Sequence, residues 1–433
     1  MSGGVRNVKS VNLAGSGTGG SVREQAVQAK EAARRLRSVS TMEKNAALLA
    51  MADALEAQSD KILAANREDV EAAKAKGTSK ALIDRLTLNQ QRLTAAAEGL
   101  REVAALPDPV GVTVSMARRP NGMEVGRVRV PLGVVAIIYE ARPNVTIDAA
   151  GLCLKAGNAV ILRGGSDAFR SNRAIVAAMC SALRETSLPE ESIQMVEDTS
   201  RSSAEELMRM TGLVDVLIPR GGRGLIQSVL ENAAVPVIET GEGNCHIFVD
   251  EDADLQQAVD IVVNAKCQRP GVCNAVETLL VHKAVAGEFL PKAAAELKER
   301  GVALRGCAES RGIVPWLEAA DEADWETEYL DLVLAIKIVA GLDEAVEHIE
   351  RYGTGHSEAI LTGSYTNARR FLEAVDAAAV YVNASTRFTD GQQFGLGAEI
   401  GISTQKLHAR GPMGLEELTS TKFVVYGSGQ IRS

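Results

Sequence analysis

Two cysteines six positions apart are the first residues of this chain that could do more than pack. They lie in NAKCQRPGVCNAVETLLVH (264–282), directly before a run that is typical of a buried strand. A nucleophilic thiol needs a lowered pKa, partial access to solvent and a donor for the developing oxyanion. Cys267 ends a segment with helical periodicity, whereas Cys273 follows RPG on an expected loop, which suits an accessible reactive group. The residues alone therefore favour Cys273 over Cys267 as a functional thiol.

The spacing of the cysteines and histidines along the chain gives little support for a Cys–His catalytic pair or a zinc site. No histidine is placed for a Cys–His pair, since the nearest, His282, lies beyond the expected strand. A C-x5-C pair with this histidine is not a standard zinc spacing, so we expect no metal site. Cys153 and Cys180 have apolar neighbours in helical segments and are interpreted as core residues.

Two glycine-rich turns have the composition of phosphate-binding loops. LRGGSDA (162–168) and IPRGGRGLI (218–226) each follow an expected strand and open an expected helix. Glycine lets the backbone approach a ligand, and a helix N-terminus offers unpaired N–H groups to a phosphate. Neither turn is GxGxxG, so each alone is equally compatible with a structural turn. Two such turns in one sheet favour a nucleotide-binding protein.

Alternating strands and helices would position these groups. Apolar spacing predicts amphipathic helices over 21–105, and the PNG turn with alternating flanks predicts a β-hairpin over 117–135. The pattern further indicates strands at 134–139, 159–164 and 235–241, helices at 146–157 and 166–186, the same rhythm over 247–383, and a final strand-like run. Such alternation builds parallel sheets with helices on both faces.

Composition excludes several classes of protein. A length of 433 residues suggests two or three domains, and a net charge of -9 argues against a nucleic-acid binder. No apolar run approaches the roughly 20 residues that span a bilayer, and the N-terminus has no apolar segment of a secretory signal. Six cysteines without a CxxC pair indicate free thiols in a reducing cytoplasm. We therefore expect a cytoplasmic protein that acts on a small molecule rather than on nucleic acid or a membrane.

Six motifs in order along the chain resemble those of the γ-glutamyl phosphate reductases, or glutamate-5-semialdehyde dehydrogenases, a family within the aldehyde dehydrogenase superfamily. The motifs are VPLGVVAIIYEARPNVTIDAAGLCLKAGNAVILRGG, IPRGG, ETGEGNCHIFVD, CNAVETLLVH, YVNASTRFTDGQQFGLGAEIGIST and HARGPMGLEEL. The resemblance runs from about residue 22 to the C-terminus and does not cover the N-terminal tail.

The resemblance implies an aldehyde dehydrogenase-like α/β fold with two doubly wound parallel-sheet domains and a β oligomerisation arm. The expected divisions are a flexible tail at 1–20, a cofactor-binding domain at 21–116 and 133–238, a catalytic domain at 239–383, and the arm at 117–132 and 384–433. An exposed pair of strands would be an open sheet edge, so we expect a homo-oligomer in which the arm pairs with another subunit.

The activity that the resemblance implies is the NADPH-dependent reduction of L-glutamyl 5-phosphate to L-glutamate 5-semialdehyde, a step of proline biosynthesis. The cysteine of the CNA motif, here Cys273, would attack the acyl phosphate and form a thioester as phosphate leaves. Asn144 of ARPN matches the oxyanion-binding asparagine of the superfamily, with the Cys273 backbone N–H as the second donor. Cys267 would then be a packing residue.

The resemblance also carries over residues for the two ligands. The cofactor positions are Arg163 near the adenosine ribose, Gly221 and Gly222 near the pyrophosphate, and Glu328 near the nicotinamide ribose. Since the substrate carries a phosphate and a carboxylate, arginines should line its pocket. The matching motifs offer Arg142, Arg269 and Arg387.

Glu239 begins ETGEGNC, where hydrolytic aldehyde dehydrogenases carry the glutamate that activates water. The residues that follow depart from the GGK pattern of those enzymes, and hydrolysis of the thioester would defeat a reductase. A structural role for this carboxylate at a strand end is therefore an equal alternative.

Two other functions remain open on the sequence. The chain could be an NAD(P)-dependent dehydrogenase that oxidises another aldehyde to an acid, which phosphate dependence would distinguish. It could also be a non-catalytic oligomeric protein of the same fold, against which the intact Cys273 and Asn144 argue. A glutamate kinase is a candidate partner that the residues neither favour nor exclude.

Overall fold

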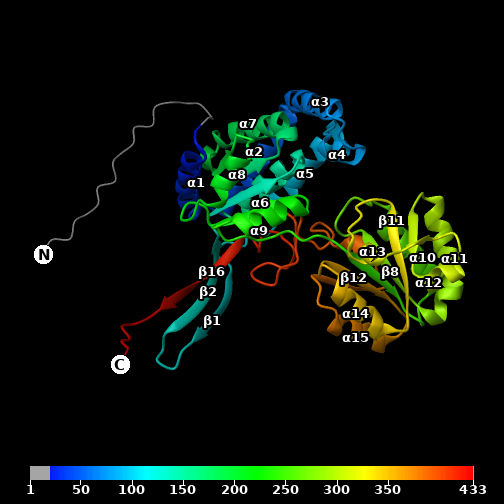
Figure 1. The fold of residues 1–433 in the computed structure, drawn as a ribbon. Coiled ribbons are helices and arrows are strands. Elements are labelled where there is room, and N and C mark those ends of the chain that lie inside the picture. Colours follow the sequence, from blue (N-terminus) through cyan, green and yellow to red (C-terminus); the bar gives the residue numbers. More distant parts are fainter. Residues whose placement is uncertain (1–19, 433) are drawn as a thin grey trace.

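Two α/β domains and a long β arm make up the computed structural model, which describes residues 20–432 (Figure 1). The predicted flexible tail at 1–20 lies outside the described residues except for Gly20. The aldehyde dehydrogenase-like α/β fold expected from the resemblance is confirmed. The domain boundaries proposed from the sequence stay a prediction, and the architecture is described below without them.

Five helices precede the first strand, as the apolar periodicity predicts. They are α1 (Val22–Leu36), α2 (Thr41–Ala57), α3 (Ser59–Ala75), α4 (Lys80–Leu86) and α5 (Gln90–Ala105). Ser21 and Ser40 form capping boxes with Glu24 and Glu43, which fix where α1 and α2 begin. The helices α2 and α5 pack together, and both also contact α6 (Pro143–Lys155).

The first sheet is parallel and has the order β5-β4-β3-β6. Its strands are β3 (Val134–Tyr139), β4 (Ala159–Gly164), β5 (Ile193–Met195) and β6 (Val216–Arg220). Its helices are α6 (Pro143–Lys155), α7 (Phe169–Leu183), α8 (Arg201–Met208) and α9 (Arg223–Asn232). The chain runs outward from β3 to β5 and returns on the other side of β3, so the strand order reverses between β3 and β6. Ligands of such sheets bind at the carboxyl ends of the strands beside this reversal.

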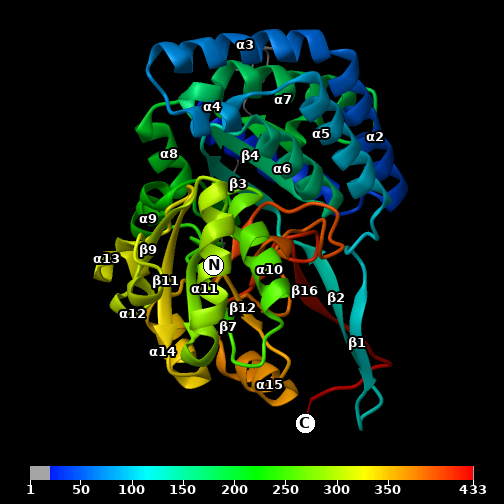
Figure 2. The ribbon, with the colours of Figure 1, turned by 90° about the vertical axis from the view of Figure 1, so that its right-hand side faces the viewer.

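The second sheet is also parallel and has the order β10-β9-β11-β8-β7-β12-β13. Its strands are β7 (Cys245–Val249), β8 (Val276–His282), β9 (Ala303–Gly306), β10 (Glu318–Ala319), β11 (Val333–Val339), β12 (Ser357–Leu361) and β13 (Ala379–Val382). One face is covered by α10 (Leu255–Cys267) and α11 (Lys283–Glu299), and the other by α14 (Leu342–Tyr352) and α15 (Tyr365–Ala374). The short helices α12 (Ala308–Ile313) and α13 (Glu322–Glu326) lie near the β9 and β10 edge (Figure 2).

The arm is an antiparallel sheet of order β1-β2-β16 that projects from the first domain (Figures 1 and 2). The predicted hairpin is present as β1 (Thr113–Arg118) and β2 (Glu124–Pro131), and the final run forms β16 (Thr419–Tyr426) along β2. Gly122 adopts a φ of 86° in the turn, which explains the glycine of PNG. Residues 384–418 precede β16 and include the 3-10 turn η3 (Thr386–Phe388) and the β14 (Ile402–Ser403) and β15 (Gly411–Pro412) pair.

One predicted strand is wrong. The segment 235–241 makes only an isolated bridge between Val237 and Leu217 instead of a strand. Pro236 has no N–H to donate to a ladder. The segment is joined to β6 by two backbone hydrogen bonds with Leu217 and by one from the Thr240 hydroxyl to the Pro219 carbonyl. The chain then leaves the first sheet and crosses to the second domain.

Candidate active site

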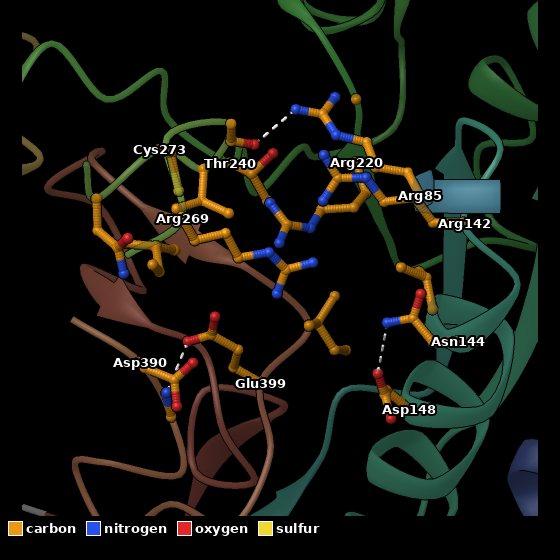
Figure 3. A pocket seen from close by; sticks show the side chains of 18 of the residues that line it. Arg85, Arg142, Asn144, Asp148, Arg220, Thr240, Arg269, Cys273, Asp390 and Glu399 are labelled. Atoms are coloured by element: carbon orange, nitrogen blue, oxygen red, sulfur yellow. Dashed lines mark hydrogen bonds between the residues drawn. The ribbon is translucent and has the colours of Figure 1, made fainter. Parts of the chain in front are cut away.

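A cavity of about 780 Å³ lies where the two domains meet. The carboxyl ends of β3 and β6 contribute Glu140, Arg142 and Arg220 from one side, next to the reversal in strand order. The loops before β7 and β8 contribute residues such as Glu242 and Cys273 from the other side. The carboxyl ends of one parallel sheet thus face the amino ends of the other across the cavity, and Figure 3 shows the side chains that converge there.

Cys273 lies on the loop between α10 and β8, half-buried in the wall of the cavity. Its peptide is held close to β7, where the Cys245 thiol donates a hydrogen bond to the Cys273 carbonyl at 3.1 Å. A Cβ at Gly243 would lie 1.5 Å from that carbonyl oxygen, so only glycine fits there. Burial raises the pKa of the Cys273 thiol, and the positive charge of Arg220 acts in the opposite sense.

A second set of hydrogen bonds fixes the residue after the thiol. The Asn274 side chain donates to the carbonyl of Thr389 at 2.9 Å, and the Thr386 hydroxyl donates to the carbonyl of Asn274 at 2.7 Å. The segment that contains η3 is therefore fastened to the loop that carries Cys273. This attachment explains how Arg387, within the same segment, reaches the cavity.

Asn144 enters the cavity from the first domain. Pro143 takes the first position of α6, where a missing N–H has no cost, and Asn144 follows with an exposed side chain. Its amide lies 3.5 Å from Asp148, whose pKa burial raises to about 7. Asn144 and Cys273 line the same cavity from opposite domains, with the Asn144 side chain directed inward (Figure 3).

Besides Arg223, which lies 3.9 Å from the carboxylate of Glu242, five arginines line the cavity. The sequence singled out Arg142, Arg269 and Arg387, and the structure brings all three together. It adds Arg85, which donates to the carbonyl of Gly271 at 2.6 Å, and Arg220 at the end of β6. Within residues 20–432, none of the five forms a salt bridge with a protein carboxylate. Burial and the charges of Arg220 and Arg85 lower the pKa of Arg142 to about 10.

Arg220 and Arg85, which sequence reasoning missed, differ in whether a sequence pattern could have identified them. Arg220 stands in IPRGG, a motif that was recognised for its glycines, so attention to the residue before them would have found it. Arg85 lies in α4, about 186 positions before its partner Gly271, and no local pattern marks it.

The turn after β6 has an open helix terminus. Gly221 and Gly222 line the cavity, and no side chain caps the start of α9 at Gly222. The Gly222 N–H donates to Glu140 at 2.9 Å, and a Cβ at Gly221 would lie 2.7 Å from the same carboxylate. The uncapped N–H groups and the absence of side chains fit a pyrophosphate group.

Glu328 lines the cavity beside the nucleophile loop. Its carboxylate accepts the Gly243 N–H at 2.9 Å, and burial raises its pKa. Gly243 is the residue that packs against the Cys273 carbonyl, so Glu328 and Cys273 are joined through one peptide.

Arg163 does not line the main cavity. Its guanidinium donates to the carbonyls of Thr199 and Ser200 at 2.6 and 2.7 Å, and it holds the loop between β5 and α8. Next to it is a second hollow of about 260 Å³, which is lined by Ser166, Phe169, Arg170, Arg173, Glu197 and Thr199. The first glycine-rich turn therefore adjoins this smaller hollow and not the cavity of Cys273.

The remaining candidates lie away from the cavity. Glu239 is not among the lining residues, and its N–H donates to Gln405 at 3.1 Å, while the next residue, Thr240, does line the cavity. Cys267 ends α10 and packs against the core of the second domain, and Cys153 is fully buried in α6. Among residues 20–432 no group of three or more His, Cys, Asp or Glu side chains could hold a metal ion. No helix within that range is long and apolar enough to cross a membrane.

Comparison with known proteins gives consistent results. The aldehyde dehydrogenase family model matches residues 10–306. The chain is 64% identical over 411 residues to a γ-glutamyl phosphate reductase of Moorella thermoacetica, across 95% of this chain and 98% of the relative. It is 62% identical to the protein of the same name from Carboxydothermus hydrogenoformans, across 94% and 98%. A crystal structure of γ-glutamyl phosphate reductase from Thermotoga maritima superimposes with a TM-score of 0.93 at 54% identity, across 96% and 100% of the two chains.

Proposed function

Since the chain belongs to the aldehyde dehydrogenase family and groups with its γ-glutamyl phosphate reductases, we propose that it reduces L-glutamyl 5-phosphate to L-glutamate 5-semialdehyde and releases phosphate. This reaction is a step of proline biosynthesis. The single observation that carries the proposal is the cavity itself, in which a cysteine lies among five arginines that have no carboxylate partner within residues 20–432. A thiol suits acyl transfer, and unpaired guanidinium groups suit a phosphorylated acid.

The proposed mechanism begins with the Cys273 thiolate, which attacks the acyl carbon and expels phosphate to leave a thioester. Asn144 and the Cys273 backbone N–H would stabilise the oxyanion of this step and of the next one. When bound, the nicotinamide cofactor would supply the hydride that reduces the thioester carbon. The thiohemiacetal that remains on Cys273 then breaks its C–S bond, so that the aldehyde leaves and the thiolate is restored.

The nicotinamide cofactor would lie across the carboxyl ends of the first sheet. Gly221 and Gly222 would hold the pyrophosphate at the open start of α9, and Glu328 would hold the nicotinamide ribose. We propose NADPH over NADH because Arg173, and also Arg170, which pairs with Glu68 and Asp69, line the hollow beside the adenosine position of Arg163. A 2′-phosphate there would meet positive charge. Equilibrium titration with NADPH and NADH checks this, and equal affinity for the two would contradict it.

The substrate arginines would divide between two anionic groups. Arg142, Arg269 and Arg387 are proposed to bind the phosphate and the carboxylate of the substrate, and Arg85 and Arg220 join this set. The free thiols favour a reducing compartment, and we propose that the protein acts in the cytoplasm. A glutamate kinase that supplies the labile acyl phosphate remains a candidate partner.

Assembly through the arm is also part of the proposal. The strand β1 is exposed along its length, and Phe423, Val425 and Tyr426 of β16 present apolar side chains to solvent. An edge of this kind is a template for pairing with another chain. Deletion of residues 418–433 should reduce the mass of the particle in light scattering, and an unchanged mass would mean that the arm makes no subunit contact.

A spectrophotometric assay with glutamate 5-semialdehyde, NADP and phosphate tests the main proposal in the reverse direction. We expect NADP reduction that requires added phosphate, because phosphate must resolve the thioester on Cys273. A dehydrogenase that hydrolyses the thioester would reduce NADP without phosphate, and a non-catalytic protein would give no signal.

A further inference from the structure

Among residues 20–432, several charged side chains on the cavity wall form no salt bridge. The guanidinium groups described above reach the cavity from several directions, while Asp390 and Glu399 lie together on one part of its wall (Figure 3). Within the described range, Glu399 forms no salt bridge, as is the case for the five arginines. Unpaired charges of both signs are costly in a partly buried cavity unless a ligand compensates them.

The position of Glu399 is set by the backbone and not by an arginine. One carboxylate oxygen accepts the Gly391 N–H at 2.9 Å, and a Cβ at Gly391 would lie 2.9 Å from the Glu399 side chain. Among residues 20–432 no donor lies within hydrogen-bond distance of its second oxygen. The neighbouring Asp390 accepts the N–H groups of Gln392 and Gln393 through one oxygen, so among the described residues each of the two carboxylates keeps one oxygen without a donor. Glu399 is the one whose pKa is raised by burial, and a cationic ligand would compensate its charge most.

The substrate of the proposed function has the matching charges. Its acyl phosphate and α-carboxylate are anionic, whereas its α-ammonium is the one cationic group. We infer that Glu399 binds the α-ammonium group and thereby selects α-amino acid substrates over acids without the amino group. This inference rests on the proposed function and adds the residue that recognises the α-ammonium group of the substrate.

A competing role for Glu399 would be proton transfer with Cys273. Burial raises the pKa of Glu399 to about 7, a range in which a carboxyl group can accept a proton at neutral pH. A base that serves the thiol would act on every aldehyde to the same extent, because the thiol is common to all. Loss of an ammonium-binding carboxylate would lower the rate with a substrate that carries an α-ammonium group and leave the rate with a substrate that lacks it unchanged. The two roles are thus separated by a pair of substrates.

The experiment compares glutamate 5-semialdehyde with 5-oxopentanoate, which lacks only the amino group, in the phosphate-dependent reduction of NADP. The variant is Glu399→Gln, which keeps an oxygen to accept the Gly391 N–H and removes the charge. We expect the kcat/KM for glutamate 5-semialdehyde to fall roughly 10- to 100-fold, mainly through KM, since one charge-assisted hydrogen bond is lost. The value for 5-oxopentanoate should change less than threefold.

Two further variants make the result decisive. Glu399→Asp retains the charge on a shorter side chain and should recover part of the preference for glutamate 5-semialdehyde. Glu373→Gln, on the outer face of α15, removes an exposed carboxylate and should leave both substrates unchanged. An equal loss on both substrates in Glu399→Gln, or no loss on either, would overturn the inference. If the wild type reduces no NADP with either aldehyde, the proposed function itself fails and the inference with it.

Discussion

The cores of the two domains treat buried polar groups differently. In the first domain Lys155 donates to Asn45 and to a carbonyl, and Asp69 accepts from Ser171. The buried side-chain atoms of that domain that have no partner among the described residues belong to Gln25, Arg163, Asn172, Ser192 and Arg220. In the second domain such atoms belong to a set that includes three histidines: Asn244, His246, Asn274, Thr278, His348, His356 and Glu358.

This difference indicates which residues in each domain are kept for packing and which are kept for the site. The first core is built mainly of aliphatic side chains, and its parallel strands are continuous apolar runs. The second core buries three histidines whose Nε2 atoms have no partner among the described residues. Such groups cost stability and persist where they shape a site. We therefore expect substitutions in the second domain to affect chemistry and those in the first to affect ligand placement.

Replacement of the nucleophile is the strongest test of this division. Cys273→Ser should abolish turnover, with a loss of at least about 10⁴-fold, since removal of a nucleophile elsewhere costs roughly 10⁶-fold. NADPH should still bind, because its proposed contacts come mainly from the first domain. Steady-state kinetics and fluorescence titration measure the two effects.

Cys267→Ser is the matched control for that variant. Cys267 lies at the end of α10 and packs against the core, so most of the activity should remain. If Cys267→Ser were inactive and Cys273→Ser active, the assignment of the nucleophile would be reversed.

Mild acid should destabilise the second domain. Burial lowers the pKa of His348 to about 2 and that of His356 to about 4, so both stay neutral when folded. Below about pH 6.5 the unfolded chain binds protons that the folded domain does not, so stability falls as the pH falls. The slope approaches about 1.4 kcal/mol per pH unit for each histidine, which gives about 3 kcal/mol in total between pH 6.5 and 5. Burial raises the pKa of Glu277 to about 8, and the proton that this carboxyl binds in the folded domain offsets part of the loss.

Tryptophan fluorescence during urea unfolding measures this loss, because Trp316 and Trp325 both lie in the second domain. His408→Asn is the control, since His408 is exposed and asparagine tolerates its positive φ of 71°. This variant should keep the acid sensitivity of the wild type. An unfolding midpoint that is the same at pH 7 and pH 5 would show that the buried histidines do not control stability.

The same division explains how much the sequence could predict. The strands at 134–139 and 159–164 were predicted with their observed bounds, because buried parallel strands are unbroken apolar runs. The segment 235–241 also begins with apolar residues, yet its Pro236 and its crossing to the other domain prevent a strand. Local apolar patterns predict strands correctly inside a domain, where the segment packs in a sheet. They predict wrongly where the chain passes from one domain to the other.

The candidate site was predictable only in part. Cys273 and Asn144 stand in contiguous motifs, and the structure brings them to one cavity. Arg85 and Glu399 come from segments far apart along the chain, and only tertiary packing brings them to it. Arg163 was expected at the cofactor, and its observed contacts with two carbonyls depend on a loop fold that no spacing encodes.

Asn144 tests whether the first domain takes part in the chemistry. Asn144→Ala should reduce kcat on the order of 100-fold, with little change in KM, because it removes one donor to an oxyanion that forms only during the reaction. Its helix should stay intact, since alanine is a good helix former and Pro143 still begins α6. Asn121→Ala, in the exposed turn of the arm, is the control. A loss below threefold in Asn144→Ala would confine the chemistry to the second domain.

The smallest effect is expected at Glu239, in the segment that joins the two domains. The thioester on Cys273 can be resolved by water, if a carboxylate activates it, or by phosphate. Glu239 lies outside the cavity lining, whereas the arginines that could hold a phosphate lie within it. We therefore expect Glu239→Gln to reduce the phosphate-dependent rate of NADP reduction by less than tenfold. Glu231→Gln, on the exposed face of α9, controls for the lost charge. Rapid NADP reduction without phosphate that disappears in Glu239→Gln would mean that water resolves the thioester, and would favour a hydrolytic aldehyde dehydrogenase.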